Sequence, residues 1–469
     1  MMALSLALLV PWAAGALLIA LDGRRRGVAW LGVAALTATL AVVLTLVFQV
    51  VRHGPQQVVT GGWPAGIGIV LRADALGGVF ALVSLVVLIA ALANEAVRGA
   101  HTRTFPGLVV LLAAGLNGLF LTGDVFNFYV FFEIAMTASY ALTTYGQRPR
   151  QLRAALIFAS VNLLGSFVFL LSVAGTYRIT GALAMADVAE RINAVGANAA
   201  MLVAVGFFVA FSVKLGLFPF HFWLPTVYAG TRPAVAAILS GAVANIGSYG
   251  LLRFGAGLFS DELRFAATAL VLLGVASILY GGVLAVSRGD DAETLAYSAI
   301  GQVGYVLVAL SVGGPIGLSA AVVYSVVNAL NKGLLFLAAG LRGPLVAAAF
   351  VIGAFSVAGV PPAAGFIAKL ELFRAAIAVH NPALLVVLVV GSVLSLIYMF
   401  QIYQRKFWVS DVRASGDRAD GDGVAGVSPL PPRLFVGALA VLVLSIGVWA
   451  EPLLVLSQDA ANVLTGRLG

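Results

Sequence analysis

The chain has 469 residues, of which 61% are hydrophobic and only 10% charged, and its apolar residues come in blocks of about twenty. This composition is typical of an integral membrane protein built as one polytopic domain. The absence of cysteine excludes disulfides, thiolate catalysis and cysteine-held iron–sulfur clusters, and the net charge of +8 comes from arginines scattered through short loops, which argues against a nucleic-acid partner.

About fourteen apolar segments are long enough to cross a bilayer. Two of them are expected to be broken helices, because proline removes a backbone donor and clashes with the preceding turn: the seventh ends in GLFPFHFWLP and the twelfth contains GVPPAAG. Between spans six and seven, residues 181–200 predict a short peripheral helix. The spans are predicted at residues 3–21, 28–51, 74–94, 106–122, 125–145, 153–175, 200–219, 233–253, 265–286, 295–312, 316–340, 346–379, 383–403 and 434–450.

The predicted fold class is therefore all-α, with two inverted five-helix repeats. Two broken helices five spans apart indicate two related halves, and an odd number of spans in each half inverts one relative to the other, as is typical of transport proteins. We expect an N-terminal three-helix segment (1–105), a first repeat (106–255), a second, inverted repeat (256–405), and a polar loop with a last helix (406–469).

The distribution of basic residues predicts the orientation in the membrane. The loop DGRRRG and the other loops on its side carry about twice as many basic residues as the opposite side. Because cytoplasmic loops are enriched in arginine and lysine, both termini are expected on the outer face. The first span has no charged segment before it and no cleavage pattern, so we expect it to be a retained helix rather than a signal peptide.

Three of the four lysines, Lys214, Lys332 and Lys369, lie inside predicted spans, whereas arginine supplies nearly all positive charge in the loops. A charge in the hydrocarbon costs about 2.5–3.5 kcal/mol on insertion scales, so such residues usually face a cavity and mark a pathway. A buried lysine can release its proton, and arginine cannot. The matching acid is Glu133 in the fifth span, with Lys214 as its expected partner. The four residues predict a proton relay.

Other interpretations of these residues stay open. A single intramembrane lysine can extend to an interface, and a glutamate–lysine pair can simply join two helices. His221, just past the break in span seven, is either a proton gate or a helix-capping residue near the interface. No phosphate-binding loop, HExxH motif or metal-spaced carboxylate cluster is present in the sequence, so we expect neither a cofactor nor a metal.

Five stretches of this sequence resemble the antiporter-like subunits shared by Mrp-type multisubunit cation/proton antiporters and the membrane arm of respiratory complex I. The resemblance is greatest to the D-type subunits of the Mrp antiporters, and it spans about residues 60 to 403. The stretches are LTGDVFNFYVFFEIAMTASYAL, KLGLFPFHFWLPTVYAG, LAYSAIGQVGYVL, NALNKGLLFLAAG and AGVPPAAGFIAKLELFRAA.

The resemblance implies a fourteen-helix fold in a bacterial cytoplasmic membrane, with other membrane subunits, protons and a monovalent cation as partners. It implies Glu133 and Lys214 as the coupling pair, Lys332 as the central relay and Lys369 as the exit-side site. The chain departs from the family where lysine or histidine is usual, since it has Asn245 in span eight, Ala292 before LAYS and Ile157 in span six.

The sequence therefore favours a proton-translocating subunit of a multisubunit Na+(K+)/H+ antiporter. Two alternatives stay open. One is a proton-pumping membrane subunit of a complex I-like NADH:quinone oxidoreductase, whose redox centres lie on other subunits. The other is a non-conducting scaffold subunit, which Asn245 and Ala292 favour because neither side chain can carry a proton at neutral pH.

Overall fold

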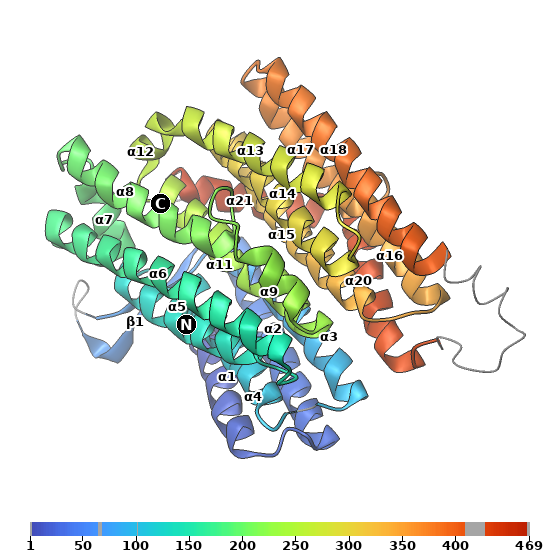
Figure 1. Cartoon of the computed structure of the whole chain (residues 1–469). Coiled ribbons are helices and arrows are strands. Elements are labelled where there is room, and N and C mark those ends of the chain that lie inside the picture. The colour runs from blue at the N-terminus through green and yellow to red at the C-terminus, as the bar shows by residue number, and fades with distance from the viewer. Residues whose placement is uncertain (1, 64–67, 101, 409–426, 467–469) are drawn as a thin grey trace, which may run out of the picture.

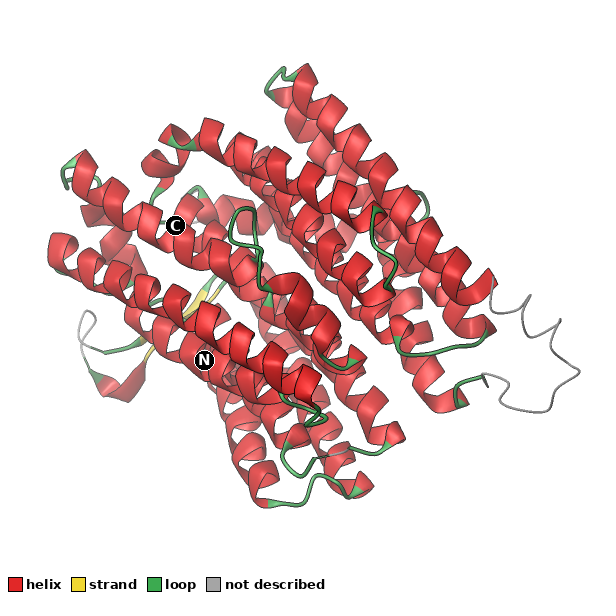
Figure 2. Ribbon diagram, in the orientation of Figure 1, coloured by secondary structure: helices red, strands yellow, loops and turns green. Residues whose placement is uncertain are grey.

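The computed structural model describes residues 2–63, 68–100, 102–408 and 427–466, and these form a bundle of broadly parallel helices (Figures 1 and 2). Twelve described helical segments are long and apolar enough to cross a membrane, and two shorter apolar helices, α4 and α16, supplement them. In chain order these elements correspond to the fourteen predicted spans. The prediction of a multi-pass helical membrane protein is confirmed.

The bounds of the elements are as follows. The first part of the chain contains α1 (Met2–Ala20), α2 (Arg26–His53), β1 (Gln56–Val59), η1 (Thr60–Gly62), β2 (Val70–Ala73), α3 (Ala75–Arg98), α4 (Phe105–Phe120), α5 (Val125–Thr143), α6 (Pro149–Thr180), α7 (Met185–Ile192), α8 (Ala197–Leu215) and α9 (Leu224–Gly230). Span eight consists of α10 (Pro233–Ile238), η2 (Leu239–Val243), α11 (Asn245–Gly250) and η3 (Leu251–Ala256). The rest contains α12 (Ser260–Phe265), α13 (Ala267–Val286), α14 (Asp291–Val312), α15 (Gly314–Ala339), α16 (Pro344–Ala358), α17 (Ala364–Ala378), α18 (Pro382–Tyr403), η4 (Gln404–Trp408), α20 (Leu430–Val448) and α21 (Glu451–Leu464).

Three small features lie outside the predicted spans. The strands β1 and β2 pair antiparallel as a small addition to the predicted all-α fold; strands of four residues are too short to show a clear alternation in the sequence. The peripheral helix expected within 181–200 is present as α7. The helix α21 follows the last span and packs against α15 and α3, which the sequence analysis did not predict.

Both predicted helix breaks are present, and they share one backbone arrangement. Each begins at a glycine in the left-handed region, Gly216 with φ 64° and Gly359 with φ 83°. The N–H of the next residue donates to the carbonyl five residues earlier, at 3.1 Å in the first break and 2.8 Å in the second. A cis peptide bond ends at Pro219 in one break and at Pro362 in the other. Span seven resumes as α9, beyond the predicted end at residue 219.

Loop contacts define one end of the bundle as an arginine-rich face. The loop after α1 contacts the loop before α4, where the Gly23 N–H donates to the Arg103 carbonyl at 2.8 Å. Arg98, at the end of α3, donates to the carbonyl of Gly340 after α15 at 3.1 Å. These loops therefore lie on one side, as the alternation of fourteen spans requires.

Span eight and α15 occupy the middle of the bundle and are buried over nearly their whole length. The first half of span eight packs against α15 and α3, and its second half, through α11 and η3, packs against α8. Two π-helical segments, η2 and η3, interrupt this span on either side of α11. Span eight thus separates α8 from α15, which carry two of the buried lysines.

Glycines allow α13 and α14 to pack at backbone contact distance. A Cβ added at Gly281 would lie 2.3 Å from the backbone nitrogen of Gly301, and one added at Gly304 would lie 2.5 Å from the carbonyl oxygen of Gly274. Small residues at such positions are the usual basis of close packing between membrane helices, because they let van der Waals contacts form between backbones.

We predict that Gly281→Ala lowers the unfolding temperature of the detergent-solubilised protein. The added methyl group has no space, and overpacking of this kind costs about 1–3 kcal/mol. Gly289→Ala is the matched control, because a Cβ there meets nothing within 4 Å. A thermal-unfolding scan in which both variants behave alike would show that the α13–α14 contact is not tight.

A buried ion pair joins the start of α3 to η3. The Asp74 side chain is fully buried, caps α3 by accepting from the Gly77 N–H at 3.0 Å, and lies 2.6 Å from Nη2 of Arg253. Arg253 also donates through Nε to the Tyr249 hydroxyl at 3.0 Å. Burial opposes ionisation of Asp74, but the charges of Arg253 and Arg72 outweigh it and lower the pKa of this carboxyl.

We predict that Asp74→Asn destabilises the protein by about 3–5 kcal/mol at pH 7, because it leaves the Arg253 guanidinium buried without a counter-charge. The folded pKa of Asp74 is lowered, so its contribution is present above about pH 4, the ordinary range of an aspartate. This contribution is lost as pH falls through the folded pKa, so the difference in free energy of unfolding between wild type and Asp74→Asn should become smaller there.

Chemical unfolding at several pH values measures this difference. Asp261→Asn is the control, since the Asp261–Arg264 pair is largely exposed and its loss should change stability little. If the two substitutions lower the free energy of unfolding equally at pH 7, the Asp74–Arg253 pair is not a stabilising contact.

Candidate functional site

The three lysines of the predicted relay are buried in the bundle. Lys214 on α8 is 5% exposed, Lys332 on α15 is 0% exposed and Lys369 on α17 is 4% exposed. No ion pair within 4.0 Å involves any of them among the described residues. Each ammonium is instead held by uncharged oxygen atoms, and these define two clusters.

The first cluster surrounds Lys214 and is formed by α5, α6 and α8. The Lys214 ammonium donates to the Asn162 carbonyl at 2.9 Å and to Ser166 Oγ at 3.3 Å, and it lies 4.3 Å from the centroid of the Phe132 ring. The predicted partner, Glu133, is the residue next to Phe132 on α5, and among the described residues it forms no ion pair with Lys214 within 4.0 Å. The structure therefore brings Glu133 and Lys214 into one cluster without a contact ion pair.

Two polar atoms of this cluster have no hydrogen-bond partner within the described part of the chain. They are Oε1 of Glu133 and Oδ1 of Asn162, and both are shielded by protein. Buried polar atoms are normally satisfied by protein or by ordered water, so these oxygens are suited to bind water next to the lysine.

The second cluster begins at Lys332 and is formed by α14, α15 and α18. The Lys332 ammonium donates to Ser298 Oγ at 2.7 Å, and this hydroxyl lies 2.9 Å from the hydroxyl of Tyr398. Tyr398 in turn donates to Ser395 Oγ at 3.1 Å. The amide nitrogen of Gln302 donates to Tyr398 at 3.1 Å and to Ser395 at 3.3 Å, which fixes both hydroxyls.

Lys369 lies at the far end of this cluster, at the break between α16 and α17. Its ammonium donates to the carbonyl of Ala358, the last residue of α16, at 3.0 Å, and to Ser392 Oγ at 2.9 Å. The helix break leaves the Ala358 carbonyl without an intrahelical donor, so it is free to hold the cation. Glycine is needed at 359, because a Cβ there would lie 2.5 Å from Cδ of Lys369.

Hydroxyl groups therefore lead from Lys332 nearly to Lys369. Ser395 and Ser392 are one turn apart on α18, and Tyr305 lies beside both. The hydroxyl-bearing residues of this cluster were not predicted from the sequence. A signal was present in LAYSAIGQVGYVL, where Ser298, Gln302 and Tyr305 recur at helical spacing in an otherwise apolar helix.

Asn245 lies between the two clusters, in span eight. Its amide nitrogen donates to Ser84 Oγ on α3 and to the Gly241 carbonyl, both at 3.0 Å. On the flanking helices, Oγ of Ser212 and Oδ1 of Asn331 are shielded and have no partner in the described ranges. Among the described residues no continuous set of protein hydrogen bonds joins Lys214 to Lys332.

The remaining predicted residues lie outside the two clusters. His221 is in the break between α8 and α9, with its ring 5.4 Å from that of Phe218 and 4.4 Å from that of Tyr280. Its Nδ1 has no partner in the described chain. Ile157 packs against the hydrophobic core on α6.

Ala292 lines a polar pocket of about 380 Å³ at the arginine-rich face. Arg405 and Lys406 of η4 line the same pocket, and Arg405 lies 3.3 Å from Asp291 at the start of α14. The basic side chains of η4 therefore lie beside Ala292, a position where the antiporter-like subunits that the sequence resembles usually have a basic residue. Phe336, on the pocket wall, is one helical turn from Lys332, about 6 Å along α15.

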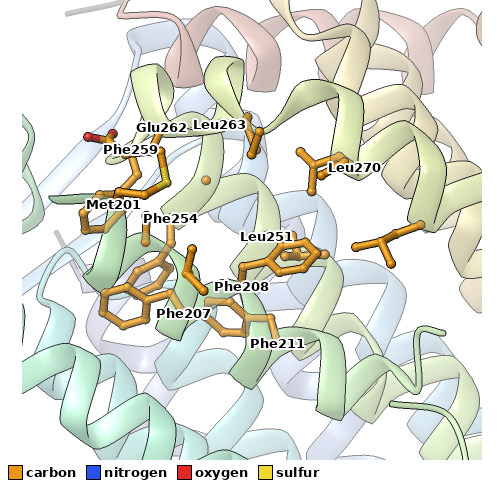
Figure 3. A pocket seen from close by; sticks show the side chains of 16 residues that line it. Met201, Phe207, Phe208, Phe211, Leu251, Phe254, Phe259, Glu262, Leu263 and Leu270 are labelled. Atoms are coloured by element: carbon orange, nitrogen blue, oxygen red, sulfur yellow. The ribbon is translucent and has the colours of Figure 1, made fainter. Parts of the chain in front are cut away.

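A second pocket, of about 180 Å³, is apolar and lies between α8, η3 and α13 (Figure 3). Its walls include Phe207, Phe208, Phe211, Phe254 and Phe259, and none of the buried lysines lines it. The only carboxylate among its lining residues is Glu262, and none of the relay residues lines it, so the two polar clusters are the stronger candidate site.

A multi-pass helical bundle with titratable amines buried in its middle is characteristic of membrane transport subunits. The family described as NADH:quinone oxidoreductase/Mrp antiporter, TM, matches residues 122–395. Antiporter subunit mnhD2 of Staphylococcus aureus is 30% identical to this chain over 98% of its length and 96% of that protein. The chain belongs to the NADH:quinone oxidoreductase/Mrp antiporter family of membrane subunits.

Solved structures agree with this family. A chain of the Mrp complex from a Dietzia species has a TM-score of 0.88 and 30% identity, covering 99% of this chain and 97% of that one. A chain of an archaeal membrane-bound sulfane sulfur reductase has a TM-score of 0.88 and 25% identity, covering 98% and 97%. One from Thermus thermophilus respiratory complex I has a TM-score of 0.82 and 26% identity, covering 98% and 99%.

Proposed function

We propose that this chain is the proton-translocating subunit of a multisubunit Na+(K+)/H+ antiporter, and that Glu133, Lys214, Lys332 and Lys369 form its proton relay. The observation that carries the proposal is the burial of three ammonium groups that have no contact with any carboxylate among the described residues. The similarity to mnhD2 and to the Dietzia Mrp complex supports an antiporter and an assembly with other membrane subunits.

The first step takes place in the cluster around Lys214. A proton that reaches Glu133 neutralises the carboxylate and removes its through-space attraction for the lysine ammonium. Lys214 then becomes a better proton donor, because a nearby negative charge favours the protonated form of an amine and that charge is now gone. Water bound by the shielded oxygens of Glu133 and Asn162 supplies the contacts for the transfer.

Past Asn245, the proton passes to Lys332 through water, since asparagine cannot carry it. From Lys332 it moves along Ser298, Tyr398 and Ser395. Each hydroxyl accepts a proton on one side and releases its own on the other, so charge moves with small displacements of atoms. Tyr305 and Ser392 complete the path to Lys369.

We propose further that the arginine-rich face is cytoplasmic, that both termini lie outside and that the membrane is the bacterial cytoplasmic membrane. The concentration of arginine on this face supports the orientation. The polar pocket beside Ala292 then provides a cytoplasmic approach that ends one helical turn from Lys332.

A non-conducting scaffold subunit is the second candidate function. The observation that favours it is the interruption at Asn245, where the hydrogen bonds among described residues do not connect the two clusters. A pump of the complex I type has weaker support, since the similarity to the Thermus complex I chain is lower in both identity and TM-score than that to the Dietzia Mrp chain.

We predict that Lys214→Ala and Lys332→Ala, made separately, each lower proton flux at least about tenfold, at the low end of the effect of a residue that transfers protons directly. The measurement is cation-driven proton movement into vesicles that contain the assembled complex, followed with a pH-sensitive dye. Arg264→Ala, an exposed charge deletion, is the control. Unchanged flux with normal assembly in both lysine variants would instead establish the scaffold function.

We predict that Tyr398→Phe lowers proton flux about tenfold, while Tyr403→Phe on the same helix does not. The first substitution removes the hydroxyl between Ser298 and Ser395, and one hydrogen bond contributes about 1.5 kcal/mol, close to a factor of ten. Both variants keep the aromatic ring, so equal thermal stability is the check on folding. Equal flux in the two variants would exclude transfer through Tyr398.

A further inference from the structure

A hollow of about 800 Å³ opens at the arginine-rich face, where the ends of several spans meet. Two of its residues, Arg26 and Arg98, belong to the start of α2 and the end of α3. The others come from α3 and from the ends of spans eight, eleven and fourteen: Glu95, Val97, Arg232, Pro233, Gly340, Pro429 and Pro431.

The hollow has an excess of positive charge. Its single carboxylate, Glu95, is only 3% exposed, accepts a hydrogen bond from the Tyr145 hydroxyl at 2.7 Å and lies 4.0 Å from Nη1 of Arg232. Among the residues that the structure describes, Arg26 and Arg98 take part in no ion pair, and Arg98 donates to the Gly340 carbonyl. Two guanidinium groups therefore have no counter-ion within the part of the chain that the structure describes, which suits a phosphate group and disfavours a cation.

The surface next to this hollow changes from charged to aromatic to apolar along α2. Trp30, one turn after Arg26, is 41% exposed, and its ring lies 6.3 Å from that of Phe435 on α20. Further along, Leu40 and Leu442 line an apolar pocket of about 440 Å³. A phospholipid has the same order of chemistry along its length: a charged headgroup, an interfacial glycerol region and apolar acyl chains.

We propose that the hollow binds the headgroup of an anionic phospholipid. The guanidinium groups of Arg26 and Arg98 hold the phosphate, Trp30 contacts the glycerol region, and the acyl chains lie along the seam between α2 and α20 over α3. The site is independent of the proton relay; only its assignment to the cytoplasmic leaflet rests on the orientation proposed above. A free inorganic phosphate shares the headgroup chemistry but not the apolar contacts.

Native mass spectrometry of the purified full-length chain, offered phosphatidylglycerol or phosphatidylcholine in detergent, tests this site. We expect retention of phosphatidylglycerol by the wild type and a loss of about tenfold in the double variant Arg26→Gln/Arg98→Gln. The matched control is Arg24→Gln/Arg25→Gln, which removes the same amount of charge just outside the hollow and should retain the lipid. Equal retention by both double variants, or of both lipids, would overturn the proposal.

Two further measurements separate the sources of phosphate and guard against misfolding. Displacement of phosphatidylglycerol by millimolar inorganic phosphate would identify a soluble-anion site and overturn the lipid assignment; failure to displace it supports the lipid. The second measurement leaves Arg26 and Arg98 in place. The fluorescence of Trp30 is taken as the difference between wild type and Trp30→Phe. Brominated phosphatidylglycerol should quench it more than brominated phosphatidylcholine does. Equal quenching by the two lipids would count against a headgroup-specific site.

Discussion

The hydrocarbon of a membrane supplies no hydrogen bonds, so every charge inside this bundle must be held by the protein itself. The structure meets this constraint in two ways. Asp74 and Arg253 are in direct contact, and such a pair keeps both charges at neutral pH. Lys214, Lys332 and Lys369 are held by hydroxyl and carbonyl oxygens instead. A neutral oxygen stabilises an ammonium without requiring a charge in return, so these lysines can lose a proton without leaving an unpaired carboxylate behind.

The broken helices provide part of this environment. An α-helix uses its carbonyls internally, and a break releases those of its last turn. Lys369 is bound by such a carbonyl, that of Ala358, and Lys214 lies two residues before the left-handed glycine that ends α8. The same left-handed glycine begins both breaks, as related halves would produce; the inverted repeats and the domain limits remain a prediction. The breaks therefore position the cations as well as interrupt the helices.

The sequence predicted those features whose physical cause is local. Apolar length identifies spans, proline and glycine identify breaks, and a lysine in an apolar run stands out because of its cost. Two local contacts have the same kind of cause: the Asp124 side chain caps α5 by accepting from the Asn127 N–H at 2.6 Å, and Glu371 lies 2.7 Å from Arg374, three residues along α17. The partners of the lysines could not be predicted, because serine and tyrosine cost little in a membrane helix and the rotation of each helix about its axis is set by packing. For that reason Glu133 and Lys214 share a cluster without the expected direct contact.

The two halves of the proposed path differ in what carries the proton. Between Lys332 and Ser395 the protein supplies hydroxyls within hydrogen-bond distance, and Ser392 contacts Lys369, so only the gap beside Tyr305 needs rearrangement. Span eight lies between Lys214 and Lys332, and its Asn245 side chain donates hydrogen bonds to Ser84 and to the Gly241 carbonyl. Two π-helical segments flank α11, and such segments occur often at functional sites. Gly241 brings this span against α15 so closely that a Cβ would lie 3.2 Å from the backbone nitrogen of Gly333, next to Lys332. In the proposed path this is a crossing for which the described residues supply no connecting hydrogen bonds, so the position of span eight would decide whether water can link the two clusters.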